Sequence, residues 1–240
     1  MITKNQIKLI KSLRLKKNRK QSGFFVAEGE KIVDELLESD LEIVNIFSIS
    51  EKYKNLKNYI SINSIQLEQI SNLKSPNNVL GIFKISANQE IDFDANIVVL
   101  EDINDPGNLG TIIRLCDWFG IKNIICSVNS VDCYNPKVVQ SSMGSISRVS
   151  ISYMEFDTIL MNDKYKTIAA DLEGVKLTKY NFSENQIIFF GNESKGLSKK
   201  LSSKIDEKIT IERFNKNVDS LNLAISVGIV LSELTKKNTN

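Results

Sequence analysis

The chain has 240 residues, 42% of them hydrophobic, a formal net charge of +2 and no histidine. This length and composition allow one large or two modest domains with a buried core, and they exclude a disordered chain. The missing histidine excludes serine-protease-type triads, cysteine–histidine pairs and HExxH zinc sites. Any catalysis must therefore use carboxylates, arginine, lysine, amides or hydroxyls.

Targeting signals and structural cysteines are not evident. No stretch approaches the roughly 18 apolar residues of a membrane helix, and the N-terminus lacks the apolar run of a signal peptide. Cys116, Cys126 and Cys133 form no CxxC pair, and an odd count argues against a disulfide framework. We expect a cytoplasmic protein with reduced cysteines, no membrane contact and no metal.

Basic residues are concentrated at the N-terminus. Residues 1–27 contain eight lysines and arginines and no acidic residue, which leaves the remainder with a net negative charge. Such a block either solubilises a helix face or contacts a polyanion through its phosphates, and its density favours nucleic acid. The residues expected to contact nucleic acid are Lys11, Arg14, Lys16, Lys17, Arg19 and Lys20.

The first part of the chain has the pattern of a small α/β domain, assigned to residues 1–88. Apolar residues at helical spacing predict a helix over 4–15, which the lysine and arginine run then ends. Further helices are expected over 28–37 and over 64–73, the latter capped by Ser64. The predicted strands are 24–27, 43–49 and 79–85.

A polar, acidic stretch follows, and we place a linker at 89–95 within it. From 96 to 240, short apolar runs alternate with helical patterns, which is typical of a parallel sheet with covering helices. The predicted strands are 97–100, 123–126, 167–170 and 187–190, and the predicted helices are 109–119, 155–162 and 221–234. Ligands of such sheets bind beyond the carboxyl ends of the strands.

The first motif, DPGNLGTIIR, follows the predicted strand 97–100 directly. Pro106 and Gly107 are typical of a tight turn, which brings Asn108 and Arg114 near the end of that strand. The plainer alternative is a turn in which Asn108 only caps the next helix.

The second motif, FGNESKGLS, also stands at the end of a predicted strand. Its GxxxxG spacing suggests a P-loop, but Leu197 stands where the phosphate-binding lysine belongs, so that interpretation fails. The chain also lacks a GxGxxG dinucleotide fingerprint. What remains is Glu193 in a glycine loop that a ligand can approach closely, or else a glutamate that caps a helix.

The third motif is SLNLA at 220–224, at the start of the last apolar helix. Ser220 is a natural helix cap, and capping alone would explain it. Asn222 needs a further explanation, because asparagine is a mediocre helix former whose amide competes with the backbone.

In combination, NxGxxxR, GNExxGL and SLNxA, in that order and at strand ends, resemble the SpoU (TrmH) family of RNA ribose 2′-O-methyltransferases in the SPOUT class. The segment KNRKQSGFFVAEGEKIV resembles the small L30e-like substrate-binding domain that many members carry. The resemblance implies an α/β fold: an N-terminal L30e-like domain and a C-terminal SPOUT domain. In the SPOUT domain, a parallel sheet with helices on both faces would contain a deep trefoil knot, an exception to the usual rule against knots.

The resemblance also implies an activity: methyl transfer from S-adenosylmethionine to a ribose hydroxyl of RNA. The implied catalytic residues are Asn108, Arg114, Glu193, Ser220 and Asn222. Cofactor contacts would come from Gly191, Ile211 and Leu221, with Gly144 and Ser145 lining the same region. Family members are homodimers in which the arginine, here Arg114, works at or near the interface. We expect the terminal helix either to contribute to that interface or to be buried within the chain.

Several departures and alternatives remain. Glu212 and Arg213 stand where the family usually has proline and methionine, and Thr111 and Ser226 replace smaller residues. Ribosomal RNA is the first choice of substrate, with 23S RNA preferred, and tRNA is the second. The competing functions are a non-catalytic RNA-binding assembly factor with this fold and a SPOUT enzyme that methylates a base.

Overall fold

The computed structural model describes residues 2–86, 91–160, 165–215 and 217–237. The chain divides into two compact units: Met1–Ala87 together with Asp132–Arg148, and Asn88–Val131 together with Val149–Asn240. The segment 132–148, which the sequence assigns to the second domain, thus packs within the first unit. The domain ranges 1–88 and 96–240 stay a prediction. No helix in the described part of the chain is both long and apolar enough to cross a membrane.

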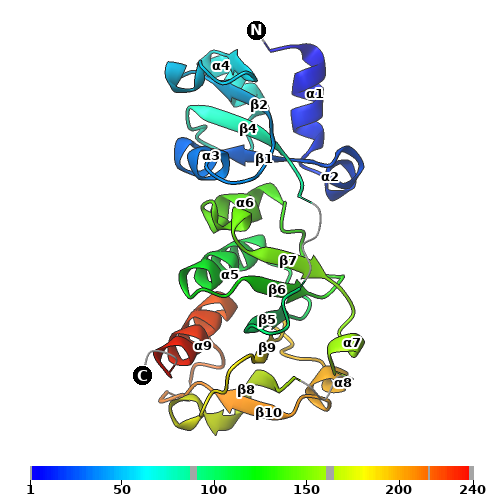
Figure 1. The fold of residues 1–240 in the computed structure, drawn as a ribbon, viewed down its shortest axis with the longest axis vertical. Coiled ribbons are helices and arrows are strands. Elements are labelled where there is room, and N and C mark those ends of the chain that lie inside the picture. The colour runs from blue at the N-terminus through cyan, green and yellow to red at the C-terminus, as the bar shows by residue number, and fades with distance from the viewer. Residues whose placement is uncertain (1, 87–90, 161–164, 216, 238–240) are drawn as a thin grey trace. The chain divides into compact units, whose positions relative to one another are not determined.

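The first unit is built on a four-stranded mixed sheet (Figure 1). Its strands lie in the order β1 (Phe24–Glu28), β4 (Val79–Lys84), β2 (Ile43–Ser48) and β3 (Tyr59–Ser61). β4 pairs antiparallel with both β1 and β2, whereas the short β3 pairs parallel with β2. The three predicted strands are confirmed, and β3 was not predicted because three residues carry too little periodicity.

Five α-helices are described in this unit: α1 (Lys4–Ser12), α2 (Lys16–Ser22), α3 (Glu30–Leu37), α4 (Ser64–Ile70) and α6 (Pro136–Ser142). The first helix was predicted over 4–15 and ends earlier, at Ser12, before the lysine and arginine run. That run forms α2, which ends at Gly23 in the left-handed conformation (φ 72°). The cap of α4 is Asn63 rather than Ser64, and its side chain accepts a hydrogen bond from the amide of Gln66.

Arg19 corrects the predicted set of nucleic-acid contacts. Its side chain is 2% exposed, and its Nε and Nη2 donate to one carboxylate oxygen of Asp132 at 2.9 and 2.5 Å. Its Nη1 donates to the carbonyls of Leu13 and Arg14. Because buried charges are retained only when they are paired and hydrogen-bonded, Arg19 is a structural residue that joins α2 to the segment 132–148. It has no surface to offer to a phosphate.

The second unit contains a six-stranded sheet in which every pairing is parallel, as predicted. The strand order is β10 (Glu207–Thr210), β8 (Thr167–Lys176), β9 (Ile187–Phe190), β5 (Ile97–Leu100), β6 (Asn123–Cys126) and β7 (Ser150–Tyr153). β5, β6 and β9 are buried along their whole length. A parallel sheet needs helices on both of its faces for this burial.

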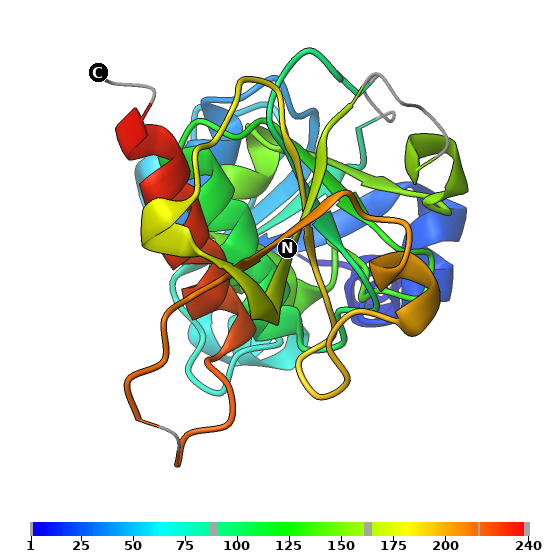
Figure 2. The same cartoon turned by 90° about the horizontal axis from the view of Figure 1, so that it is seen from below.

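The two faces of this sheet are covered by different helices (Figure 2). One face packs against α7 (Asp157–Leu160) and α8 (Lys199–Ser202) through Ile159 and Leu201. α5 (Pro106–Trp118) and α9 (Leu223–Lys237) contact each other and lie on the other face. The apolar side of α9 is used within the chain, since Val227, Val230, Leu231 and Leu234 are fully buried.

Part of the predicted linker 89–95 packs against the second unit. Residues 89 and 90 lie outside the described residues, as do 161 and 162 at the end of the predicted helix 155–162. Ile91 and Phe93 pack against the core of the second unit, and the ring of Phe93 stacks on Tyr165 with centroids 5.1 Å apart.

Candidate active site

Two motifs meet because β5 and β9 are neighbours in the sheet, with Leu100 paired to Phe190 at their carboxyl ends. The pairing continues one residue further, where the amide of Glu101 donates to the carbonyl of Phe190 at 2.9 Å. Beyond it, the side chain of Asn192 donates to the carbonyl of Asp102 at 2.7 Å. The loops after β5 and β9 are thereby held together at the end of the sheet where parallel sheets bind ligands.

The first loop leads into α5, which is capped by Asp105 and not by Asn108. The carboxylate of Asp105 accepts from the backbone amide of Asn108 at 2.9 Å, and Pro106 occupies the first helical position. The expectation that Asn108 caps this helix is therefore wrong. Its side chain, which a capping role would occupy, is directed toward the second loop.

The second loop turns back on itself so closely that its first residue must be glycine. The amide of Asn192 donates to the carbonyl of Gly196, and the amide of Gly196 donates back at 2.9 Å. A β-carbon on Gly191 would lie 2.1 Å from the carbonyl carbon of Gly196. This closed loop holds Glu193 beside α5, where Glu193 accepts a hydrogen bond from Asn108 rather than capping a helix.

The third motif supplies Asn222 at the start of α9. The helix begins at Leu223, and the side-chain oxygen of Asn222 accepts from the amide of Ile225 at 3.3 Å. Asn222 therefore stands in the capping position that the sequence suggested for Ser220. Ser220 lies before the helix and is exposed.

A chain of side-chain hydrogen bonds joins the three motifs. Nδ2 of Asn222 donates to Oδ1 of Asn108 at 2.9 Å, and Nδ2 of Asn108 donates to Oε1 of Glu193 at 3.1 Å. The two bonds fix the amide orientation of Asn108, since one side accepts and the other donates. These residues line a pocket of about 460 Å³, together with Asp105, Ser220, Leu221 and Leu223. Four of the five predicted catalytic residues are thus brought together.

Arg114 is the predicted catalytic residue that does not line this pocket. It is exposed on α5, six residues beyond Asn108, which places it about 120° around the helix from Asn108. Among the described residues that line the pocket, two are carboxylates and none is basic.

Asp105 and Leu223 also line the pocket, and neither was predicted. Asp105 could have been found, because an aspartate before a proline is a strong signal for the start of a helix.

The predicted cofactor residues fall into two groups. Gly191 belongs to the closed loop, Ile211 follows β10, and Leu221 lines the pocket with a side chain that is 47% exposed. Gly144 and Ser145 belong to the first unit, where Gly144 lies against the side chain of Glu35. Neither residue is among those that line the pocket.

Two of the four departures from the family pattern, Glu212 and Arg213, have hydrogen-bond partners of their own. The carboxylate of Glu212 accepts from the hydroxyl of Thr178, and this hydrogen bond lowers the pKa of Glu212. Nη1 of Arg213 donates to the carbonyl of Val218 at 3.3 Å. Neither side chain lines the pocket.

The described ranges contain no group of three or more histidine, cysteine, aspartate or glutamate side chains placed to hold a metal ion. The predicted absence of a metal stays a prediction.

Two family models match the chain. The model of the SpoU rRNA Methylase family matches residues 95–232, and that of the MRM3-like substrate binding domain matches residues 4–81. Among curated proteins, the chain is similar to the 23S rRNA (guanosine(2553)-2′-O)-methyltransferase RlmP of Bacillus subtilis. The two are 24% identical over 243 residues, with 96% of each chain covered.

Solved structures give the same result over nearly the whole chain. A putative RNA methyltransferase of the TrmH family from Porphyromonas gingivalis is 30% identical, with a TM-score of 0.90 and 99% of each chain covered. An AdoMet-bound rRNA methyltransferase from Sinorhizobium meliloti is 27% identical, with a TM-score of 0.86 and coverage of 98% of this chain and 96% of that one. These matches carry both the fold and the motif-bearing segments, and the chain belongs to the SpoU rRNA methylase family.

Proposed function

We propose that this protein transfers a methyl group from S-adenosylmethionine to a ribose 2′-hydroxyl of ribosomal RNA, with 23S RNA as the first choice. The observation that carries the proposal is the hydrogen-bonded chain Asn222–Asn108–Glu193 in a pocket beyond the carboxyl ends of β5 and β9. The similarity to the Bacillus subtilis enzyme, whose name specifies 2′-O-methylation of 23S rRNA, supports both the chemistry and the substrate.

The residues present fit an adenosyl cofactor. The closed loop that begins at Gly191 brings Glu193 to the pocket, and the half-exposed side chain of Leu221 lines the same pocket with an apolar surface. Cofactor sites combine such apolar surfaces with a few fixed polar groups. Ile211 would contribute to the same contact. Bound S-adenosylmethionine would supply the methyl group, already activated by its sulfonium.

The role of the chain's own residues is to position the ribose and to accommodate charge. One oxygen of Glu193 accepts from Asn108, which leaves the other able to accept from a ribose hydroxyl. Ser220 at the rim of the pocket offers a hydroxyl to the same sugar. Holding the attacking oxygen in line with the methyl group removes most of the entropic cost of the reaction.

In this transfer the ribose oxygen would bond to the methyl carbon as the C–S bond of the sulfonium breaks, and the hydroxyl would lose its proton. The negative charge that this proton loss leaves on the oxygen calls for a cation, whereas the described lining of the pocket has two carboxylates and no basic residue. Arg114 is the proposed cation, binding the target phosphate and stabilising the oxygen. A guanidinium keeps its proton and is a poor base, so its role is electrostatic, and the hydroxyl proton would leave through the phosphate that Arg114 binds. Because Arg114 lies outside the pocket of its own chain, the proposal includes a homodimer in which Arg114 contributes to the pocket of the second copy.

A trefoil knot in the second unit and a cytoplasmic location are part of the same proposal.

The proposal is tested by mapping 2′-O-methylation and base methylation across ribosomal and transfer RNA in cells with and without the gene. Loss of one ribosomal site is expected on deletion. Loss of a tRNA site instead would move the substrate to tRNA, loss of a base methylation would favour the base-modifying alternative, and an unchanged map would favour the non-catalytic assembly factor.

A further inference from the structure

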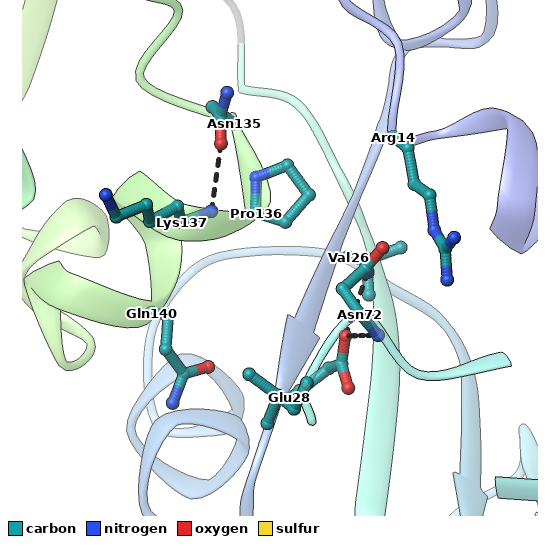
Figure 3. A pocket seen from close by; sticks show the side chains of 9 residues that line it. Arg14, Val26, Glu28, Asn72, Asn135, Pro136, Lys137 and Gln140 are labelled. Carbon is teal, nitrogen blue, oxygen red and sulfur yellow. Dashed lines mark hydrogen bonds between the residues drawn. The ribbon is translucent and has the colours of Figure 1, made fainter. Parts of the chain in front are cut away.

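The first unit contains a cavity of about 490 Å³ of its own (Figure 3). Its floor is formed by Val26 and Glu28 of β1, with residues of the α1–α2 turn and of the segment after α4 on one side and residues of α6 on the other. α6 falls in the range matched by the SpoU model, so the cavity joins segments from both family models. The lining residues are Arg14, Val26, Glu28, Asn72, Leu73, Asn135, Pro136, Lys137 and Gln140.

A buried carboxylate lies in this cavity with part of its hydrogen-bonding capacity unused. Glu28 is 5% exposed, and its Oε1 accepts from the backbone and side-chain nitrogens of Asn72, both at 2.8 Å. Its Oε2 accepts from the hydroxyl of Ser71, which is the one donor to that oxygen among the described residues. A carboxylate oxygen accepts two hydrogen bonds, so Oε2 can accept one more.

A guanidinium stands at the edge of the same cavity. Nη2 of Arg14 donates to the carbonyl of Ser71 at 2.7 Å, which ties the basic N-terminal helices to the residues that hold Glu28. A guanidinium carries five N–H groups, so this bond leaves donors for an anion. Arg14 is exposed, as are Lys16, Lys17 and Lys20 in α2.

The remaining walls are apolar surfaces and an amide. Val26, Leu73 and Pro136 provide flat apolar contact, and the side-chain amide of Gln140 lies across the cavity from Arg14 (Figure 3). Apolar walls, convergent polar groups and a cation at the rim match the three parts of a nucleotide: the face of the base, its edge and its phosphate.

We infer that this cavity binds an unpaired RNA nucleotide whose base carries an exocyclic amino group. The inference rests on the proposed RNA substrate and adds a site that reads a base, apart from the pocket for the reacting ribose. The amino group of the base donates a hydrogen bond to Oε2 of Glu28, which can accept one more. The base packs on Val26 and Pro136, and the phosphate of the nucleotide binds the guanidinium of Arg14.

The chemistry of Glu28 discriminates between bases. Adenine, cytosine and guanine carry amino donors on their edges, which a carboxylate accepts. The one edge donor of uracil lies between two carbonyl oxygens, and these would face the carboxylate and repel it. A base within a duplex has its edge paired, so recognition requires a loop, a bulge or an end.

The test compares two fluorescently labelled RNA hairpins with one stem, a loop of cytidines in one and of uridines in the other. Binding to the full-length protein is measured by anisotropy at one salt concentration, because phosphate contacts depend strongly on salt. The wild type should bind the cytidine loop about tenfold more tightly, as expected for one well-placed base contact. Gln140→Trp, which fills the cavity, should bind both loops with the affinity of the uridine loop.

A matched control is Gln21→Trp, which places the same bulky side chain on the exposed surface of α2, outside the cavity. It should keep the tenfold preference. Glu28→Gln is a second variant of nearly the same shape and should lose the preference while its affinity for the uridine loop is unchanged. Urea unfolding of each variant verifies that it is folded. If Glu28→Gln does not fold, the loop preference of Gln140→Trp alone tests the inference.

Equal binding of both loops by the wild type, or a preference that persists in Gln140→Trp, would overturn the inference. Methyl transfer to ribosomal RNA by the wild type is measured separately. Absence of transfer would count against the proposed enzymatic function, whereas transfer without a loop preference would count against the cavity alone.

Discussion

The side-chain nitrogen of Asn222 donates to the side-chain oxygen of Asn108 at 2.9 Å, between two residues separated by 114 positions in the sequence. The side-chain nitrogen of Asn108 donates in turn to a carboxylate oxygen of Glu193. The side-chain amides of Asn222 and Asn108 each both donate and accept a hydrogen bond. Replacing either asparagine by an apolar residue therefore leaves a neighbouring polar group without its partner.

Asn108→Ala should lower methyl transfer by about 100-fold or more, as loss of a positioning contact in an active site does. The reason is that both Glu193 and Asn222 lose the partner that orients them. Initial rates with tritiated S-adenosylmethionine and ribosomal RNA give the measurement. Thr111→Ala, which removes an exposed hydroxyl bound to the carbonyl of Gly107 on the same helix, is the control and should retain activity.

Arg114→Ala should abolish methyl transfer while binding of S-adenosylmethionine, measured by calorimetry, survives. Arg114→Lys should restore little, because a lysine supplies charge without the two-pronged geometry that phosphate recognition uses. Turnover near the wild-type rate in Arg114→Ala would remove this residue from the mechanism.

Light scattering should report a mass of about twice 27.1 kDa. Trp118 is 83% exposed on α5, the helix that carries Arg114, and a carboxylate there should oppose burial against a second copy. Trp118→Glu should therefore shift the protein toward the monomer and reduce methyl transfer together with it. Leu172→Glu, at another exposed apolar position, should do neither. A wild-type monomer would contradict the dimer.

Much of the sheet could be predicted from the sequence, and the reason lies in burial. β5, β6 and β9 are buried on both faces, so they appear in the sequence as uninterrupted apolar runs with the bounds that the structure shows. β7 and β10 carry polar residues and are only partly buried, so their sequences lack the apolar run that predicts a buried strand. α6 was missed although Asn135 caps it and Pro136 opens it, because seven residues hold too few turns to show periodicity.

The site was predictable as a set of residues but not as a geometry. Motif order grouped Asn108, Glu193, Ser220 and Asn222, whereas their caps and hydrogen-bond directions depend on contacts between distant segments. The burial of Arg19 likewise could not be predicted from the sequence. Arginine is seldom buried, and its partner Asp132 lies 113 residues away, so a surface role was the natural expectation.

Asp132→Asn should destabilise the protein by about 3–5 kcal/mol, because it leaves the guanidinium of Arg19 buried without its counter-charge. Lys20→Ala, at the exposed neighbouring position, should change the free energy of unfolding by about 0.5 kcal/mol or less. Urea denaturation of the full chain measures both. Equal stabilities of the two variants would mean that Arg19 has no structural role.

Stability should fall in acid, in part through Asp206. Its carboxylate accepts from the hydroxyl and the amide of Thr167 at 2.7 and 2.9 Å, and these bonds hold its pKa below the ordinary value of 3.8. A lowered carboxyl pKa contributes stability that is present above pH 3.8 and is lost as the pH falls through the folded pKa. Asp206→Asn should flatten the unfolding profile in this range, whereas Asp40→Asn, at an exposed aspartate, should leave it unchanged.

The central claim is that the pocket around Asn108 methylates a ribose. Ribosomal RNA would be incubated with the full-length protein and S-adenosylmethionine carrying a labelled methyl group, digested to nucleosides and analysed by mass spectrometry. The account predicts that the label appears in a 2′-O-methylated nucleoside with the wild type and is lost with Asn108→Ala. Label on a base, or label on the ribose that persists undiminished in Asn108→Ala, would contradict it.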